Sequence, residues 1–281
     1  MPTLKELIAD NDPLIVPSIY DGISALLVRE AGFKAAYIGS YATGAAKYGV
    51  PDIGYLGVED MADQVRRLAP VTGVPIIVDG EGGWGNPLHV ARAVQVLERA
   101  GAAATHIEDH AFGKHLTMQP SVLPVDEAVQ KIKAAVDARA SEDFLIIART
   151  DSAGVEGSSA AVDRVLAYQE AGADGLFIAS PQPLDDASYQ RLRAEAKVPI
   201  YAIDLPGHSA ADHARQGANV VLYFALAHLA AKAGMEAALT QLAKEGSTVA
   251  LEGQLGSLWD YDEFLGIAGA REKARQSGLI D

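Results

Sequence analysis

The chain has 281 residues, of which 49% are hydrophobic and 21% are charged, with a formal net charge of −14 and no cysteine. This composition supports one large buried core and excludes a disordered chain, and the acidic balance without any cluster of Lys and Arg excludes a nucleic-acid surface. The lack of cysteine excludes disulfides, zinc–thiolate sites and a catalytic thiol.

Short apolar runs alternate with longer segments of helical period along most of the chain. The expected strands, in chain order, are 14–16, 35–38, 74–78, 103–107, 144–148, 175–178, 198–203 and 220–223. The expected helices between them are 22–31, 58–68, 88–100, 125–138, 159–171 and 186–196. Eight such units predict an α/β fold, a TIM (β/α)8 barrel, whose sites lie at the carboxyl ends of the strands. A doubly wound sheet has a similar number of units and stays open as an alternative.

Three segments lie outside this repeat. Residues 39–57 and 111–123 are too long for ordinary turns between a strand and a helix, and we predict them to be binding loops. From about residue 225 the sequence predicts three further helices, so we expect a single domain, 1–281, with a C-terminal helical extension. The sequence has no secretory leader and no apolar run of membrane length, which indicates a cytoplasmic protein without membrane contact.

Carboxylates gather at the ends of the third and fourth expected strands. Asp79 and Glu81 follow the third strand, and Glu108 follows the fourth. In a barrel these ends meet on one face, and oxygen ligands suit Mg²⁺ or Mn²⁺. The pattern predicts a divalent cation site with Asp79 as its firmest member. The alternative is a set of solvated turn carboxylates.

Arg149 directly follows the fifth expected strand, where an unpaired guanidinium would be very costly. Its partner is either a substrate carboxylate or a neighbouring acid, Glu108 or Asp151, and the sequence leaves both open. His106, inside the fourth strand, is interpreted as a satisfied core histidine and is left out of the predicted site.

Several short motifs follow one another along the chain. They are Tyr-Ile-Gly-Ser-Tyr at 37–41, Val-Asp-Gly-Glu-Gly-Gly-Trp-Gly at 78–85, Ala-Gly-Ala-Ala-Ala-Thr-His-Ile-Glu-Asp at 100–109, Lys114, and Ile-Ile-Ala-Arg-Thr-Asp at 146–151. This set resembles the isocitrate lyase and phosphoenolpyruvate mutase superfamily, especially its methylisocitrate lyase-like branch. The resemblance covers nearly the whole chain.

The resemblance implies a barrel whose last helix is exchanged with a partner subunit in a homotetramer, and Mg²⁺ or Mn²⁺ that binds together with a small carboxylate. The metal-site residues that it implies are Asp52, Asp79, Glu81 and Glu108. The substrate-binding residues that it implies are Tyr37, Gly39, Ser40, Tyr41 and Arg149.

These residues predict a Mg²⁺-dependent carbon–carbon lyase that acts on a 2-hydroxy or 2-oxo carboxylate through an enolate. The predicted catalytic residues are Lys114, His115, Arg149 and Glu108. Leu116 stands where the lyases of the family carry a cysteine, so a carboxylate-binding protein without turnover is one alternative. Carbon–phosphorus chemistry of the phosphonopyruvate mutase or hydrolase type is the other.

His115 is the candidate for proton delivery, because an imidazole with a pKa of about 6.5 suits acid/base work at neutral pH. We expect His115→Ala to lower kcat at least ~100-fold, the lower end of the effect of losing a general acid or base. Steady-state kinetics on the true substrate measures this loss, and full activity of the variant would remove His115 from the mechanism.

Overall fold

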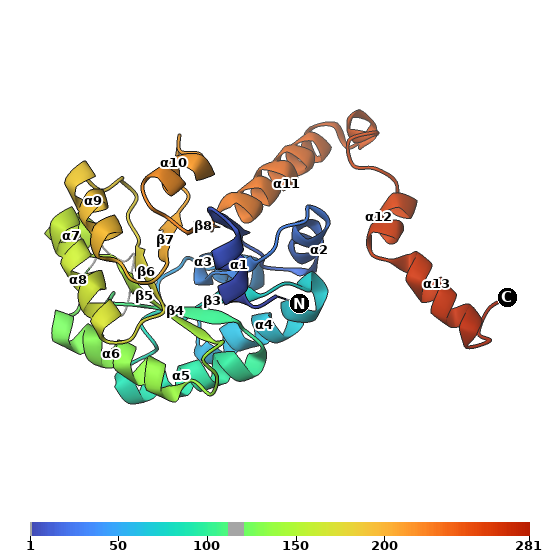
Figure 1. Ribbon diagram of the computed structural model, residues 1–281. Coiled ribbons are helices and arrows are strands. Elements are labelled where there is room, and N and C mark those ends of the chain that lie inside the picture. The colour runs from blue at the N-terminus through green and yellow to red at the C-terminus, as the bar shows by residue number, and fades with distance from the viewer. Residues whose placement is uncertain (1, 112–120) are drawn as a thin grey trace. The chain divides into compact units, whose positions relative to one another are not determined.

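The computed structural model describes residues 2–111 and 121–281. Eight strands run parallel in one sheet, in the order β1-β8-β7-β6-β5-β4-β3-β2. The two outermost strands of this order are linked by a parallel bridge between Ser18 and Tyr37 and by the Ile19 N–H, which donates to the Tyr37 carbonyl at 2.8 Å. The sheet therefore curls into a nearly closed barrel (Figure 1), which confirms the TIM barrel and excludes a doubly wound sheet.

All eight expected strands are present. They are β1 Leu14–Pro17, β2 Ala36–Ile38, β3 Ile76–Asp79, β4 Ala104–Glu108, β5 Leu145–Thr150, β6 Gly175–Ile178, β7 Ile200–Ile203 and β8 Val220–Tyr223. Three strands run slightly further than the sequence predicted, so that Asp79, Glu108 and Arg149 lie within β3, β4 and β5 and not behind them. The parallel pairing of Glu108 with Arg149 extends the two strands to this point.

The expected helices are also present, and most of them surround the barrel (Figure 1). The helices up to β8 are α1 Leu4–Asp10, α2 Gly22–Glu30, α3 Ser40–Tyr48, α4 Val58–Thr72, α5 Pro87–Ala100, α6 Val125–Ala138, α7 Ala153–Glu156, α8 Ser158–Glu170, α9 Asp186–Glu195 and α10 Ala210–Arg215. Favourable caps define their ends. The Asn86 side chain accepts from the first turn of α5, and Gly101 ends the same helix in the left-handed conformation.

Helix α3 corrects the prediction that residues 39–57 form a loop. The alanines and the lysine of this stretch favour a helix, and Ala42, Thr43 and Gly44 bury its inner face. Gly49 then ends the helix in the left-handed conformation, with φ of 65°. Burial of one helical face thus outweighs the turn preference of the glycines.

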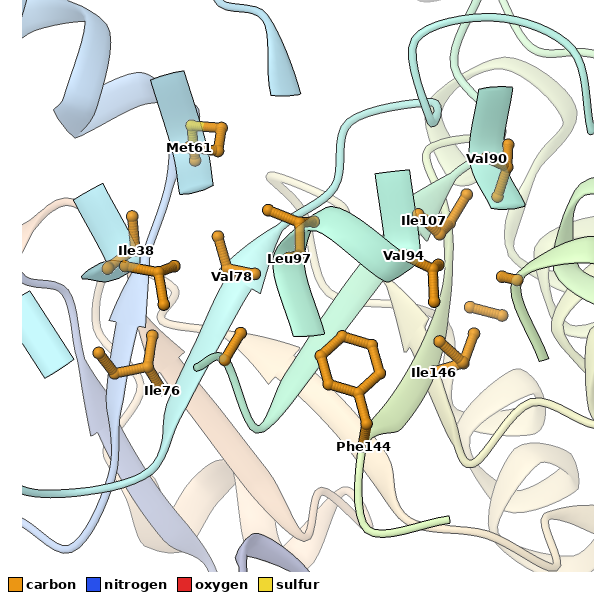
Figure 2. Packing of buried hydrophobic residues seen from close by; sticks show 14 of the residues in the cluster. Ile38, Met61, Ile76, Val78, Val90, Val94, Leu97, Ile107, Phe144 and Ile146 are labelled. Atoms are coloured by element: carbon orange, nitrogen blue, oxygen red, sulfur yellow. The ribbon is translucent and has the colours of Figure 1, made fainter. Parts of the chain in front are cut away.

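The outer core lies between the barrel and its helices. Figure 2 shows Val90, Val94 and Leu97 of α5 beside the strand residues Val78 and Ile107. The three α5 residues recur at helical spacing and form one apolar face, whereas the strand residues point outward from the barrel. Burial of this face fixes α5 against β3 and β4.

The inner core fills the barrel itself. Its members include Ile77 on β3, Ala104 on β4, Leu145 and Ile147 on β5, and Phe177 on β6. Each lies one residue away from an outward-facing neighbour, as the two-residue period of a strand requires. The same period continues to the carboxyl ends of these strands and decides which polar side chains point into the barrel.

The chain divides into two compact units, Met1–His228 and Leu229–Asp281. The predicted helices beyond about residue 225 are confirmed as α11 Leu226–Glu245, α12 Leu258–Phe264 and α13 Ile267–Gln276, with a short 3-10 turn at Val249–Leu251. Within the second unit, the Arg271 guanidinium lies 4.5 Å from the centre of the Trp259 ring. Among the described helices, none combines the length and the apolar character needed to cross a membrane.

Candidate metal and carboxylate site

Strand geometry gathers polar side chains inside the barrel at its carboxyl end. Asp79 lies two residues after the inward-facing Ile77, and His106 lies two residues after Ala104. Arg149 likewise follows Ile147. Register aligns these positions across the sheet, because Asp79 pairs with His106 and Glu108 pairs with Arg149. The four side chains therefore face one another over neighbouring strands.

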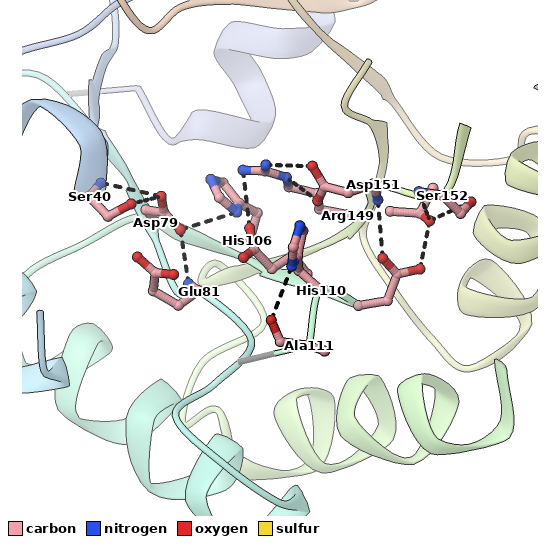
Figure 3. Close-up of polar contacts among 12 residues, drawn as sticks. Ser40, Asp79, Glu81, His106, His110, Ala111, Arg149, Asp151 and Ser152 are labelled. Atoms are coloured by element: carbon pink, nitrogen blue, oxygen red, sulfur yellow. Dashed lines mark hydrogen bonds and ion pairs between the residues drawn. The ribbon is translucent and has the colours of Figure 1, made fainter. Parts of the chain in front are cut away.

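The Asp79 carboxylate is held by donors from the start of α3 and from the turn after β3 (Figure 3). Its Oδ2 accepts from the Ser40 hydroxyl at 2.8 Å and from the Ser40 backbone N–H at 3.2 Å. Its Oδ1 accepts from the Glu81 N–H at 2.9 Å. These three hydrogen bonds hold the buried Asp79 carboxylate in place at the mouth of the barrel.

His106 was left out of the predicted site, and the structure places it beside Asp79. The ring is fully buried, its Nε2 lies 2.9 Å from the Tyr37 hydroxyl, and its Nδ1 lies 3.7 Å from Oδ1 of Asp79. The tyrosine orients the imidazole edge toward the carboxylate. A sequence signal existed, because a polar residue two positions before Glu108 must share the inward face of β4.

Asp79, His106 and Glu108 form a group that can hold a metal ion. Each side chain offers one ligand atom, and these atoms lie within 4.8 Å of one another. All three side chains are buried, so a bound cation would offset charges that are costly without compensation. Two carboxylates suit Mg²⁺ or Mn²⁺, whereas an imidazole is more usual on transition metals. The donor set therefore fits a divalent cation.

Arg149 is paired with acids on both sides. Its Nε and Nη2 donate to the two oxygens of Asp151 at 2.9 and 2.8 Å, and its Nη1 lies 3.2 Å from Oε2 of Glu108. Its guanidinium also lies 5.5 Å from the centre of the Phe177 ring. Burial disfavours the charge, yet Asp151 and Glu108 attract it and raise the pKa of Arg149 well above its ordinary value. The internal ion pair left open by the sequence is present, beside the metal-binding group.

The end of β2 and the start of α3 carry the other predicted substrate-binding residues. A Cβ on Gly39 would lie 2.8 Å from the Tyr37 ring, so glycine allows the chain to turn closely over that ring. Ser40 binds Asp79, as described above, whereas the Tyr41 ring leans toward Phe224 and His228, with centroids 6.2 and 5.2 Å away. Tyr41 is half exposed.

The loop after β3 is tied to β4. The Gly80 N–H donates to the His106 carbonyl, and the Glu108 N–H donates to the Glu81 carbonyl, both at 2.9 Å. Glu81 is buried and has φ of 49°, which is unusual for a residue with a side chain. These bonds hold the strand end that carries Asp79 against the strand that carries His106 and Glu108.

Gly80→Ala is expected to destabilise the fold by about 1–3 kcal/mol, the usual effect of overpacking. The new Cβ would lie 2.6 Å from the His106 carbonyl and from the Thr105 hydroxyl. Urea denaturation measures the loss. Gly154→Ala is the control, because nothing lies within 4 Å of its Cβ position. Equal stability of the two variants would contradict this tight contact.

A cavity of about 290 Å³ opens beside the metal-binding group. Glu81, Glu108, Trp84 and Lys131 are among its lining residues. The Lys131 ammonium donates to the Gly82 carbonyl at 3.0 Å, and burial lowers the pKa of this lysine. The cavity thus presents both signs of charge within reach of Glu108.

The remaining predicted site residues are Asp52, Lys114 and His115. Asp52 lies in the segment between α3 and α4 and is partly exposed. Lys114 and His115 fall within residues 112–120 and so lie outside the described residues. The catalytic roles predicted for these two residues stay predictions.

Comparison with known proteins agrees with this geometry. The model of the phosphoenolpyruvate phosphomutase family matches residues 4–243. A 2-methylisocitrate lyase of Shewanella oneidensis is 36% identical over 200 residues, which cover 70% of this chain and 68% of the relative. A 2,3-dimethylmalate lyase of Eubacterium barkeri is 30% identical over 279 residues, which cover 96% of this chain and 95% of the relative.

Solved structures agree as well. A crystal structure of phosphonopyruvate hydrolase in complex with oxalate and Mg²⁺ superposes with a TM-score of 0.87 at 29% identity, and the match covers 96% of both chains. The family model spans the barrel and reaches into α11, and the relatives match over two thirds of their length or more. The chain therefore belongs to the phosphoenolpyruvate phosphomutase family.

Proposed function

We propose that the protein is a Mg²⁺-dependent carbon–carbon lyase that acts on a small 2-hydroxy or 2-oxo carboxylate through an enolate. One observation carries the proposal: the partly buried Arg149 guanidinium lies 3.2 Å from Glu108, which is itself a member of the metal-binding group. A fixed positive charge and a cation site thus share one carboxylate. The two lyases described above are similar enzymes whose names specify small carboxylic acids.

The metal would be held by Asp79, Glu108 and His106, and the family resemblance adds Glu81 and Asp52 to the residues that would serve it. When bound, Mg²⁺ supplies a Lewis acid that stabilises negative charge on a carbonyl oxygen. The neighbouring Arg149 supplies a fixed positive charge, which does not need to reorganise during the reaction. Mn²⁺ is the other candidate ion, and the imidazole of His106 is the feature that favours it.

Arg149 would bind the substrate carboxylate. An arginine has five N–H donors in a planar fork; Asp151 accepts from Nε and Nη2, and Glu108 lies 3.2 Å from Nη1, so a carboxylate would use the further N–H groups of Nη1 and Nη2. The Asp151 pair fixes the plane of the guanidinium, so little side-chain entropy would be lost when a carboxylate binds. Tyr37 on β2, Gly39 directly after this strand, and Ser40 and Tyr41 at the start of α3 would line the same mouth.

The proposal is tested by product release from a panel of 2-hydroxy and 2-oxo di- and tricarboxylates, with Mg²⁺ and with EDTA. We expect one substrate to release pyruvate or another 2-oxo acid with Mg²⁺ and none to do so with EDTA. An Asp79→Asn preparation run in parallel excludes a contaminating enzyme. Product formation that is equal with EDTA would contradict a metal-dependent lyase.

Carbon–phosphorus chemistry is the second candidate, because the matching family model is that of phosphoenolpyruvate phosphomutase and a similar solved structure is a phosphonopyruvate hydrolase. Phosphonopyruvate is therefore included in the panel, and release of phosphate would favour this reading. Tight binding of oxalate with Mg²⁺ and no turnover of any compound would favour a carboxylate-binding protein.

We further propose a homotetramer in which a C-terminal helix is exchanged between subunits, in the cytoplasm. Helix α11 has no buried residue, and Leu229, Met235, Leu239 and Leu242 are exposed along it. Large exposed apolar surfaces of this kind mark protein interfaces.

Light scattering is expected to give a mass about four times the 29.5 kDa of one chain. Leu239→Glu should lower this mass, because a carboxylate in an apolar interface loses its hydration without a partner. Leu88→Glu is the control, since Leu88 is also exposed but lies on the barrel helix α5. A monomeric wild-type protein would contradict the tetramer.

A further inference from the structure

We propose that Asp109 is a positioning residue for the Arg149 clamp, meaning Arg149 together with Asp151. Asp109 belongs to neither the metal-binding group nor the predicted substrate site, and its side chain is fully buried. The inference rests on the proposed function, because it assigns a role in binding the substrate carboxylate. It concerns the support of the clamp and not the clamp itself.

The Asp109 carboxylate holds the turn that follows β5. Its Oδ1 accepts from the Asp151 backbone N–H at 3.1 Å, and its Oδ2 accepts from the Thr150 hydroxyl at 2.6 Å. In addition, the Asp109 N–H donates to the Arg149 carbonyl at 3.2 Å. Arg149, Thr150 and Asp151, at the end of β5, are thus all hydrogen-bonded to Asp109, the residue that follows β4. Figure 3 shows the Arg149–Asp151 pair and the neighbouring Ser152.

A buried arginine balances the charge of Asp109. Arg164 Nη1 lies 3.3 Å from Oδ2, and the Tyr168 hydroxyl donates to the same oxygen at 2.8 Å. Glu156 in turn binds the other edge of the Arg164 guanidinium at 2.6 and 2.7 Å. Burial raises the pKa of Asp109, while the hydrogen bonds from Thr150, the Asp151 N–H and Tyr168 oppose this effect. The carboxylate is therefore surrounded by donors on both oxygens.

The network also reaches the chain beyond residues 112–120. The Leu123 N–H donates to the Asp109 carbonyl, and Arg164 Nη1 donates to the Leu123 carbonyl, both at 2.8 Å. Asp109 and Arg164 thus hold the backbone at Leu123, shortly before α6. One buried pair anchors both the clamp and this point.

An asparagine cannot replace this carboxylate. The four donors approach two oxygens, whereas an amide offers one acceptor oxygen and presents N–H groups on its other side. In one orientation of the amide, the Asp151 N–H loses its acceptor. In the other, the donors from Thr150, Arg164 and Tyr168 lose theirs. The turn that sets the plane of the Arg149 guanidinium would then shift.

A comparison of oxalate binding by the wild-type protein and by the Asp109→Asn variant tests the inference. Calorimetry with saturating Mg²⁺ is expected to show that Asp109→Asn weakens oxalate binding about 10-fold or more, the range for a hydrogen bond to a charged group. The affinity for Mn²⁺ alone, followed by electron paramagnetic resonance, should stay unchanged, because Asp79, His106 and Glu108 are intact. A merely structural role would not separate these two readouts.

Asp174→Asn is the matched control. Asp174 lies near the other end of β5, where its carboxylate also accepts a backbone N–H, that of Ile146 at 2.9 Å, and also binds an arginine, Arg139. This variant should lose comparable stability and keep wild-type oxalate affinity. Loss of oxalate affinity in both variants would reduce the effect to general destabilisation and overturn the inference.

The remaining outcomes are distinct. Wild-type oxalate affinity in Asp109→Asn overturns the positioning role and leaves the proposed function intact. A wild-type protein that binds Mn²⁺ but no oxalate overturns the proposed function and this inference together. If Asp109→Asn does not fold, Thr150→Val removes a single donor from the carboxylate, and we expect oxalate affinity to fall about 3-fold or more. An unchanged affinity in Thr150→Val would overturn the inference.

Discussion

Arg149→Met is expected to lower kcat/KM at least about 100-fold, the range for removal of one preorganised donor at a site of developing charge. The same change removes the cation that the partly buried Asp151 and the buried Glu108 share. Loss of one partner of a buried ion pair costs about 3–5 kcal/mol, so the variant should also be clearly less stable. Steady-state kinetics and urea denaturation measure the two effects.

Arg139→Met separates the two effects of this change. Arg139 forms an ion pair with Asp174 and donates to the Phe144 carbonyl, at the amino end of β5. We expect a loss of stability with kcat/KM retained. Arg149→Lys keeps the charge but loses the paired donors to Asp151, and its activity should lie between that of wild type and that of Arg149→Met. Full activity of Arg149→Met would remove this residue from the site.

Asp79→Asn is expected to weaken Mg²⁺ and Mn²⁺ binding at least about 100-fold, since loss of even an outer hydrogen-bond partner of a metal ligand costs about 10–100-fold. Asp79 is the member of the metal-binding group that both Ser40 and Glu81 hold in place. An amide removes the negative charge and presents N–H groups toward the cation. Activity should fall with metal affinity and return in part at high Mn²⁺ concentration.

Electron paramagnetic resonance of free Mn²⁺ measures the binding, and Mg²⁺ is measured by competition. Asp63→Asn is a charge-matched control, because Asp63 lies on the outer helix α4 and pairs with Lys47 and Arg67. It should bind both metals like the wild-type protein. Wild-type metal affinity in Asp79→Asn would contradict the assignment of the cation site to Asp79 on β3.

The sequence alone predicts much of the site, because the barrel simplifies the problem. Eight apolar runs separated by helical segments are enough to predict parallel strands whose carboxyl ends meet on one face. Asp79, Glu108 and Arg149 stand at the ends of three such runs, so their proximity follows from local pattern. The motifs around them also predict the family correctly.

The tertiary structure alone decides how these groups are paired. His106 reads as a core histidine until the register of β3 and β4 sets it opposite Asp79. The stretch that follows β2 reads as a loop until burial of one face makes it α3.

The support of the Arg149 clamp also depends on contacts between residues that are distant in sequence. Asp109 meets Thr150 and Tyr168, which are 41 and 59 residues away along the chain. Local sequence determines the period of an element and the face on which each residue lies. The partner of a buried charge depends on the register and packing of distant elements, which only the folded barrel fixes.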